Sequence, residues 1–290
     1  MSSDRNRSEG WKHAKLTGHE NEELVTEDIK NDKVLQDRIL HAAKKDGRTI
    51  VNIKVGGLTE TEVESVFGDK TKSKTDMTIT LDDGSVIGVS IKKSLGGQVY
   101  LISPDRFIQG FEKQFNKTIP ENIKRAIALY WGTASDVSDI VNKYGSKNKD
   151  YELRKHRLTA NTLKGYDEKL YKDLLIWFDD NMEDIYTFCF SSGLAKNKKD
   201  WADLVWYKND LNEVEVDEVI NIMDTKIKLK HRAYYGSRTG GSTIQLPFGF
   251  VQRHSPTKKI PGDMQFHHSY EDIMMAINEY TKAINLKENK

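Results

Sequence analysis

The sequence predicts a mixed α/β fold, in which a mixed central β-sheet is flanked by helices. Two segments that alternate apolar and polar residues, 48–55 and 75–91, indicate strands. An amphipathic segment that begins at Ser103-Pro104 indicates a helix, because serine caps helices and proline suits their first position. Helical and strand-like segments follow one another along the 290 residues, which is typical of helices layered on a sheet.

The N-terminal part of the chain is expected to hold a tail, a helix and the first strand. Residues 1–10 are polar and read as a loose tail. A helix is expected from about His19, since Glu20, Glu22 and Glu23 suit the positive end of a helix dipole. Its apolar spacing up to residue 40 is irregular, which favours two helical pieces. The strand over 48–55 is expected to stop at Gly56-Gly57.

A β-hairpin is expected in residues 74–94, KTDMTITLDDGSVIGVSIKKS. Its strands, 75–81 and 86–91, are joined by Asp82-Asp83-Gly84, in which glycine supplies the positive φ of a tight turn. Asp76 opens the first strand and Lys92 closes the second, so both are expected at one end of the hairpin. Residues two apart share a strand face, which places Ser90 beside Lys92 in the same cleft.

The rest of the chain is assigned by the same signals. Strands are expected at 96–102, 184–190 and 204–207, and helices from Ser103, over 120–142 and over 170–182; residues 143–150 resemble a linker. We therefore predict two domains. Residues 1–205 form a core with a helical insertion, and residues 206–290 form a C-terminal segment with a hairpin and a closing helix.

Composition excludes several classes of protein. The single cysteine, Cys189, excludes an internal disulfide framework and a multi-cysteine metal site. No apolar run reaches 18 residues, so no membrane span is predicted and a cytoplasmic location is expected. The formal net charge is only +1, so any affinity for nucleic acid must come from local patches.

The hairpin carries residues suited to phosphodiester hydrolysis. A carboxylate can hold a divalent cation that polarises the phosphate, and a lysine can orient water or stabilise the charge that develops. Asp76, thirteen further residues and then Ser90-Ile91-Lys92 resemble the signature of the PD-(D/E)xK nuclease superfamily. That pattern is an aspartate, a hairpin and then Asp/Glu-x-Lys, and its members include many type II restriction endonucleases.

The resemblance implies a restriction-endonuclease-like core that hydrolyses double-stranded DNA with Mg²⁺. Asp76 and Glu22 would hold the metal together with the carbonyl of Ile91, while Lys92 would position the attacking water. Glu22 is chosen because residues 18–22, GHENE, are similar to the family's helix before the first core strand, which often contributes a glutamate. Many members dimerise to cut two strands, so a homodimer is left open.

Two positions depart from the family pattern. Thr75 stands where proline is usual, and Ser90 stands at the position of the second acid, where it is expected to act through a water. Some enzymes that resemble this pattern take the missing acid from the following helix. Asp105 is the first candidate for that role here, and Glu112 is the second.

Two regions are predicted to contact DNA. Lys72, Lys74 and Lys93 flank the candidate site and could bind phosphates on either side of the cut. Residues 231–254 combine glycines with residues that read bases, since arginine pairs with guanine and glutamine with adenine. Within that segment the predicted DNA-binding residues are Arg232, Arg238, Gln245 and Arg253. The alternative is a surface hairpin with a flexible tip. Lys196 to Lys199 is expected to be a solvated turn, with phosphate contact left open.

Three other functions remain open at this point. The first is a homing, phage or repair nuclease of the same fold. The second is a DNA-binding protein with a decayed catalytic site, which the serine at position 90 favours. The third is an interaction protein with no role in nucleic acid, which the near-zero net charge favours.

Overall fold

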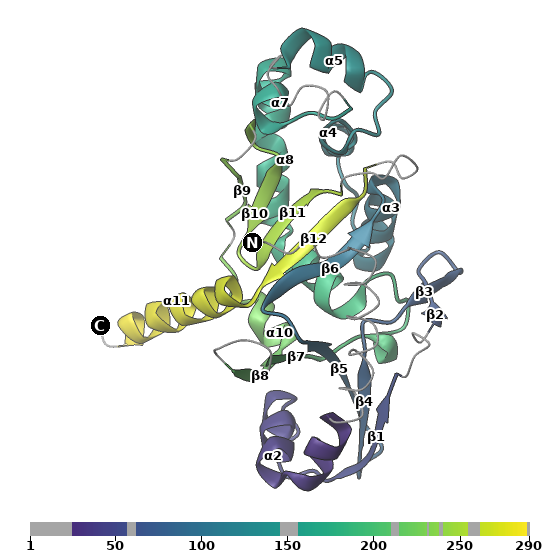
Figure 1. The fold of residues 1–290 in the computed structure, drawn as a ribbon, viewed down its shortest axis with the longest axis vertical. Coiled ribbons are helices and arrows are strands. Elements are labelled where there is room, and N and C mark those ends of the chain that lie inside the picture. Colours follow the sequence, from purple (N-terminus) through teal and green to yellow (C-terminus); the bar gives the residue numbers. More distant parts are fainter. Residues whose placement is uncertain are drawn as a thin grey trace, which may run out of the picture. The chain divides into compact units, whose positions relative to one another are not determined.

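The computed structural model describes residues 25–56, 62–145, 156–209, 215–230, 232–237, 240–254 and 262–288. The chain divides into two compact units, each made from two stretches of sequence (Figure 1). The first unit is Met1–Lys93 with Ala195–Ile222, and the second is Ser94–Leu194 with Met223–Lys290. The domain boundary predicted after residue 205 falls inside a strand of the first unit, so the units do not follow that division.

A five-stranded sheet forms the centre of the first unit. Three of its four strand pairs are antiparallel, but β5 and β7 run parallel, so the sheet is mixed. Helix α2 and this sheet confirm the predicted fold class of a mixed sheet flanked by helices. In spatial order the strands are β1 (Ile50–Val55), β4 (Met77–Leu81), β5 (Val86–Lys92), β7 (Leu204–Asn209) and β8 (Val216–Asn221).

One face of this sheet packs against helix α2 (Lys33–Ala42). Because side chains alternate along a strand, β4 buries Met77, Ile79 and Leu81 on this face and turns Thr78 and Thr80 to the other. The helix contributes a matching apolar stripe of Leu35, Ile39 and Leu40. On β4 the opposite face therefore carries polar side chains, whereas on β7 it buries Val205 and Tyr207.

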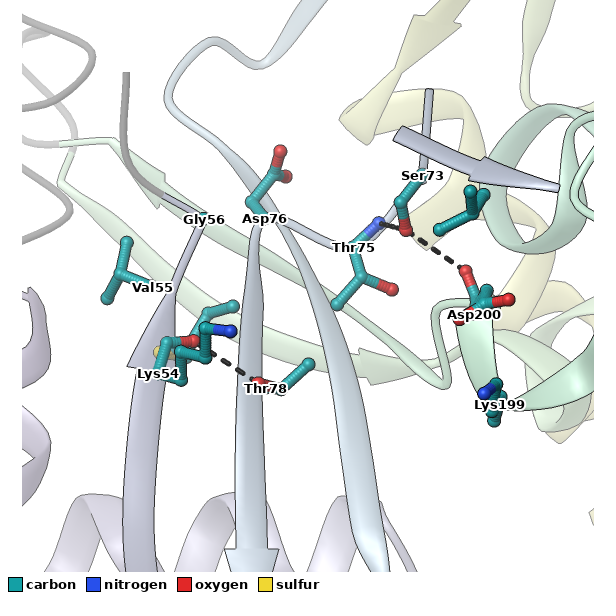
Figure 2. Close-up of a pocket in the computed structure, with 11 residues that line it drawn as sticks. Lys54, Val55, Gly56, Ser73, Thr75, Asp76, Thr78, Lys199 and Asp200 are labelled. Atoms are coloured by element: carbon teal, nitrogen blue, oxygen red, sulfur yellow. Dashed lines mark hydrogen bonds between the residues drawn. The ribbon is translucent and has the colours of Figure 1, made fainter. Parts of the chain in front are cut away.

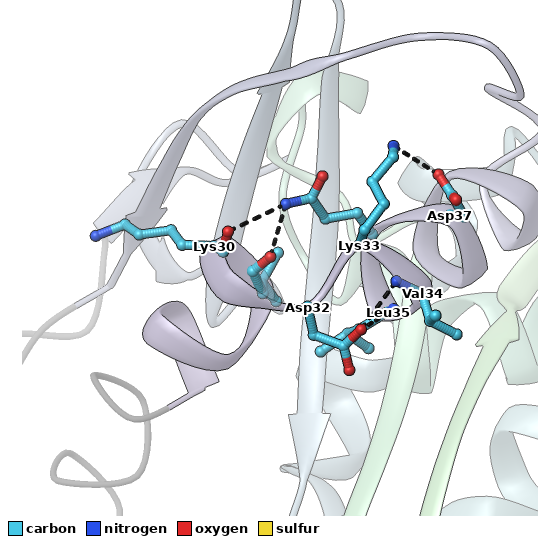
Figure 3. A network of polar contacts seen from close by, with 8 residues as sticks. Lys30, Asp32, Lys33, Val34, Leu35 and Asp37 are labelled. Atoms are coloured by element: carbon cyan, nitrogen blue, oxygen red, sulfur yellow. Dashed lines mark hydrogen bonds and ion pairs between the residues drawn. The ribbon is translucent and has the colours of Figure 1, made fainter.

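The start of α2 is fixed by a capping network (Figure 3). The carboxylate of Asp32 accepts hydrogen bonds from the backbone amides of Val34 at 2.8 Å and Leu35 at 3.1 Å. The side-chain amide of Gln36 reaches back to the carbonyl of Ile29 at 2.9 Å. A cap of this kind stabilises a helix by about 1 kcal/mol. Residues 25–31 are helical as well, so the two helical pieces expected here are confirmed, while the predicted start near His19 lies outside the described residues.

The predicted hairpin is confirmed. Met77 of β4 lies opposite Val89 of β5, and the two strands are joined through a turn at residues 82–85. Gly84 has a φ of +78°, which is the conformation that the turn requires of glycine. A separate two-stranded ribbon, β2 (Glu62–Glu64) and β3 (Lys70–Lys72), lies between β1 and β4 in sequence and was not predicted.

The second unit is built on an antiparallel five-stranded sheet. Its order is β6 (Gly96–Ile102), β12 (Met264–Ser269), β11 (Gly249–Arg253), β10 (Thr243–Leu246) and β9 (Tyr234–Tyr235). An aromatic cluster joins the sheet to the helices. The ring centroid of Phe107 lies 5.6 Å from those of Phe188 and Phe266. The helices of this unit are α3 (Pro104–Phe115), α4 (Glu121–Trp131), α5 (Val137–Tyr144), α7 (Ala160–Tyr166), α8 (Glu168–Asp180), α9 (Met182–Thr187) and α11 (Tyr270–Glu288); α10 (Ile222–Lys226) begins at the boundary between the units.

The helices and strands predicted in this unit are confirmed except in two places. The predicted linker over 143–150 begins inside α5, and its residues 146–150 lie outside the described part of the chain. The strand predicted over 184–190 is wrong, because α9 continues into a π-helical turn, Phe188–Ser192. Almost every side chain there is buried, so the apolar run carries no period that distinguishes a strand from a buried helix. The helix predicted over 120–142 is two helices, because Gly132 adopts a φ of +83° and ends α4. None of the described helices combines the length and apolar character needed to cross a bilayer.

Candidate active site

Asp76, Ser90 and Lys92 meet at one end of the hairpin in the first unit. Asp76 directly precedes β4, and its backbone amide donates to the carbonyl of Val89 at 2.9 Å, which places it opposite Ser90. Ser90 and Lys92 are two residues apart on β5 and share a strand face. This is the face that α2 does not cover. The predicted convergence of these three side chains is therefore what the structure contains.

The three side chains form one hydrogen-bonded chain. The ammonium of Lys92 donates to Oγ of Ser90 at 2.6 Å, and that hydroxyl donates to Oδ2 of Asp76 at 3.2 Å. A lysine ammonium can only donate, so the Ser90 oxygen accepts from Lys92 and its own proton is directed to the carboxylate. Ser90 thus bridges a positive and a negative side chain.

A backbone amide completes the support of the carboxylate. The N–H of Ile91 donates to Oδ2 of Asp76 at 2.7 Å, which is a short, charge-assisted bond. Ser90 is only 2% exposed, so its hydroxyl is held inside the sheet, whereas Asp76 and Lys92 are half-buried. One carboxylate oxygen is therefore anchored from two sides, and Oδ1 accepts no hydrogen bond from any residue that the structure describes.

A tight contact with the segment before β7 positions strand β5. The amide of Gly88 donates to Oδ2 of Asp203 at 2.8 Å, and the amide of Asp203 donates back to the carbonyl of Gly88 at 2.8 Å. A Cβ atom at position 88 would lie 2.5 Å from the carbonyl oxygen of Trp201. Only glycine allows this approach, two residues before Ser90.

The side chains present suit Mg²⁺ held in its usual manner. Magnesium prefers oxygen ligands, keeps several waters and commonly takes one or two carboxylates together with substrate phosphate. The free Oδ1 of Asp76 and the carbonyl of Ile91 are oxygen donors of this kind. Among the described residues there is no cluster of three His, Cys, Asp or Glu side chains that could hold a metal alone. Glu22, the predicted second carboxylate, lies outside the described residues.

The two substitutes considered for the second acid lie in the other unit. Asp105 is in the first turn of α3, and Glu112 is one turn from its end. The carboxylate of Glu112 accepts from the backbone amide of Ile119 at 2.9 Å and pairs with Lys124 at 3.1 Å. Glu112 therefore has a structural role that caps the segment between α3 and α4.

The lysines predicted to contact DNA lie in the first unit. Lys72 ends β3 opposite Glu62 and is exposed, while Lys74 and Lys93 are half-buried on the segments that lead into Asp76 and away from Lys92. Their proposed role in binding phosphate stays a prediction.

Three of the four predicted base-reading residues can be placed in the second unit. The guanidinium of Arg232 lies 5.8 Å from the ring of Tyr234. The amide of Gln245 donates to the hydroxyl of Thr243 at 2.9 Å. Arg253 is turned toward the interior, where its Nε donates to the carbonyl of Trp131 at 3.0 Å, and burial lowers the pKa of its guanidinium. Arg238 lies outside the described residues, and base contact by the others stays a prediction.

A row of polar side chains on the second sheet was missed. Gln252 donates to Gln265 at 3.0 Å, and Gln265 donates to Gln98 at 2.7 Å, across the three strands β11, β12 and β6. His267 lies 3.3 Å from the amide of Gln252 and stacks on the ring of Phe250 at 4.4 Å. Burial lowers the pKa of His267, which keeps its ring neutral near pH 7. Alternation within 249–253 and 264–269 could have indicated a shared face, but not the pairing with β6.

A pocket that adjoins Asp76 was also missed (Figure 2). It has a volume of about 100 Å³ and lies within the first unit. Its lining residues are Lys54, Val55, Gly56, Val63, Ser73, Thr75, Asp76, Met77, Thr78, Lys199 and Asp200. Lys54 is on a strand and Lys199 is on a turn far along the chain, so their presence in one pocket was not visible in the sequence.

Comparisons with known proteins found similarity among solved structures alone. No family model matches the sequence, and no curated protein matches it. Among solved structures, the chain is similar to the restriction endonuclease MspI in complex with its cognate DNA, at 15% sequence identity and a TM-score of 0.46. The similarity covers 81% of this chain and 77% of that one.

Proposed function

We propose that this protein is a Mg²⁺-dependent endonuclease that hydrolyses phosphodiester bonds of double-stranded DNA. The observation that supports this most directly is the chain from Lys92 through Ser90 to Asp76, with one carboxylate oxygen left free. A lysine ammonium, a bridging hydroxyl and a carboxylate lie together at the end of a hairpin, on the sheet face that α2 leaves uncovered. The PD-(D/E)xK signature read from the sequence predicts the same three positions.

Each residue then has a distinct role. Asp76 offers Oδ1 to a divalent cation, and the carbonyl of Ile91 and the predicted Glu22 would complete the protein ligands. When bound, such a cation polarises the phosphate and lowers the pKa of a water that attacks phosphorus. Lys92 orients that water and stabilises the negative charge that develops on the phosphate. Because water attacks directly, the reaction needs no serine or cysteine nucleophile.

Ser90 keeps the lysine in place in this scheme. Where the family pattern has an acid, the serine adds no charge, so the only carboxylate of the hydrogen-bonded chain is Asp76. Its hydroxyl accepts from Lys92 and donates to Asp76, which holds the ammonium near the carboxylate without direct contact. The side chain is buried and its geometry is fixed before any substrate arrives, as electrostatic catalysis requires.

We propose that cleavage is sequence-specific, as in type II restriction endonucleases. The uncharged row of Gln98, Gln265 and Gln252 supports this, since its hydrogen bonds fix which amide groups point outward as donors and acceptors. Arg232, Arg238, Gln245 and Arg253 remain the predicted base-reading residues of the 231–254 segment. Two copies of the chain would act on the two DNA strands. Sedimentation of the protein with and without DNA tests whether such a dimer forms.

Digestion of a large DNA of known sequence tests activity and specificity together. We expect fragments whose ends map to a short recurring sequence, formed with Mg²⁺ and absent with EDTA. Ends scattered at random would support a nuclease without sequence preference. Intact DNA at all Mg²⁺ concentrations would contradict the proposal.

A second candidate function is DNA binding without cleavage, which the serine at the second-acid position favours. That protein would shift DNA in a salt-sensitive manner while leaving it uncut. The digestion and a gel shift on the same preparation separate the two functions, because only the nuclease yields new ends.

A further inference from the structure

The pocket beside Asp76 lies on the catalytic face of the first sheet. Lys54 of β1 lies opposite Thr78 of β4, so both side chains belong to the face that α2 does not cover. Figure 2 shows Lys54 on one side of Thr78 and Lys199 on the other, with Asp76 at the end of the same strand. The pocket therefore continues the site along β4 rather than forming a separate cavity.

The turn that carries Lys199 is held firmly. It is a single 3-10 turn, Lys198–Asp200, and the hydroxyl of Ser73 donates to the carbonyl of Asp200 at 3.0 Å. The indole of Trp201 donates to the carbonyl of Ala195 at 2.8 Å on the other side of the turn. Because these contacts fix the backbone, the position of Lys199 at the pocket is set by the fold and not by a loose loop.

The two lysines give the pocket an unbalanced positive charge. Neither ammonium forms an ion pair with any residue that the structure describes, and both side chains are exposed. The carboxylate of Asp76 is already coupled to Lys92 through Ser90. Among the described residues that line the pocket, Asp200 is the only other one with a carboxylate. The two lysine ammonium groups outnumber the one remaining carboxylate, and this excess of positive charge favours an anionic ligand.

We propose that Lys54 and Lys199 bind a phosphate of the DNA backbone next to the phosphate that is cut. This inference rests on the proposed function, because it takes DNA as the substrate that crosses Asp76. A volume of about 100 Å³ suits a small anionic group, and the exposed lysines are open to a backbone that runs over the surface. The subsite positions the strand by charge and makes no contact with a base.

Salt-dependent binding measures this contact separately from catalysis. Binding of a DNA duplex is measured without Mg²⁺ for the wild type, Lys54→Gln, Lys199→Gln and the charge-preserving Lys54→Arg. Each lost phosphate contact should reduce the slope of log K against log[salt] by about 0.9. We expect that loss for both glutamine variants and none for Lys54→Arg. Lys30→Gln on the N-terminal helix removes a lysine paired with Glu27 at 2.8 Å and serves as the matched control.

The outcomes separate this inference from the proposed function. Slopes that stay unchanged in Lys54→Gln and Lys199→Gln, or that fall equally in Lys30→Gln, overturn the subsite even if the wild type cuts DNA. Reduced slopes in only the two pocket variants support the subsite, even if the wild type binds DNA and fails to cut it. For an active enzyme, we further expect KM to rise about tenfold in either pocket variant, with kcat changed less than twofold, because a positioning contact of about 1.4 kcal/mol contributes to binding alone.

Discussion

The ammonium of Lys92 lies 2.6 Å from the hydroxyl oxygen of Ser90, and this bond links the lysine to the carboxylate of Asp76. The nuclease pattern that the sequence resembles has an acid at this position, and the serine still links Lys92 to Asp76. A neutral bridge keeps one negative charge at the site where two would otherwise repel each other. In the proposed mechanism, catalysis therefore depends on the hydroxyl of Ser90 as well as on the charged pair.

Removal of that hydroxyl should weaken catalysis without abolishing it. In Ser90→Ala, Lys92 loses its acceptor and Asp76 keeps only the amide of Ile91, so we expect kcat to fall about 10- to 100-fold. Single-turnover cleavage of a duplex measures the change. Ser85→Ala in the hairpin turn removes a hydroxyl that donates to the exposed Asp83, and this variant should cut at the wild-type rate. Equal rates for wild type and Ser90→Ala would show that the bridge has no role.

A methyl group at position 88 should destabilise the first unit. The Cβ of Gly88→Ala would lie 2.5 Å from the carbonyl oxygen of Trp201, which is backbone and cannot turn aside. We expect the free energy of unfolding to fall by about 2 kcal/mol, as for other overpacked cores. Urea denaturation followed by circular dichroism measures it. Gly165→Ala, near the end of α7, has only a 4.0 Å contact and should be neutral or slightly stabilising.

Stability at low pH should depend on Asp217. Burial raises the pKa of Asp217, but hydrogen bonds from Arg38 at 2.7 Å and Trp206 at 2.6 Å outweigh it, so the pKa lies below its usual value. A carboxyl group whose pKa is lower in the folded state than in the unfolded state stabilises the fold at pH values above its unfolded-state pKa. This contribution is lost as the pH falls through the folded-state pKa.

We therefore expect Asp217→Asn to lower the free energy of unfolding by about 1 kcal/mol at pH 7, a modest figure because the pair is partly solvated. The difference from wild type should shrink as the pH is lowered through the acid range. Denaturant titrations at several pH values measure this trend. Asp37→Asn, which removes an exposed partner of Lys33, should change stability little at any of them. A deficit in Asp217→Asn that does not depend on pH would contradict the linkage.

The glutamine row should affect site preference more than rate. Gln252→Ala removes the donor to Gln265 and frees the rest of the row, so we expect a loss of about 1–3 kcal/mol of discrimination for each base contact involved. Sequencing of the ends after digestion of a large DNA should show additional, related sites. Gln109→Ala on α3 removes an exposed glutamine outside the row and should leave the pattern unchanged. An identical set of sites in Gln252→Ala would exclude base reading by this row.

Local signals in the sequence were sufficient to predict the hairpin and the convergence of Asp76, Ser90 and Lys92 at its end. Alternation with a period of two places Ser90 and Lys92 on one face, and a glycine turn brings Asp76 to them, so every step depends on neighbours in sequence. The capped helix at Ser103 was predicted for the same reason. Two assignments failed. Almost every residue over 184–190 is buried, so that segment shows no period, and at Gly132 a single backbone angle ends the helix.

Features formed by distant segments could not be predicted in this way. Lys54 and Lys199 line one pocket because β1 pairs with β4 and the turn before β7 packs beside β5. Gln98 and Gln265 are 167 residues apart, and their contact depends on β6 pairing with β12. Neither arrangement leaves a local pattern in the sequence, because the order of strands within a sheet is a property of the whole fold.

The most direct test of the catalytic assignment is Mg²⁺-dependent cleavage of plasmid DNA by wild type, Asp76→Asn, Lys92→Ala and the matched control Asp82→Asn. Asp82 is exposed in the turn of the same hairpin, so its change alters charge without touching the site. We expect wild type and Asp82→Asn to cut at equal rates, while Asp76→Asn and Lys92→Ala lose about 100-fold or more. Equal cutting by all four proteins would contradict the account.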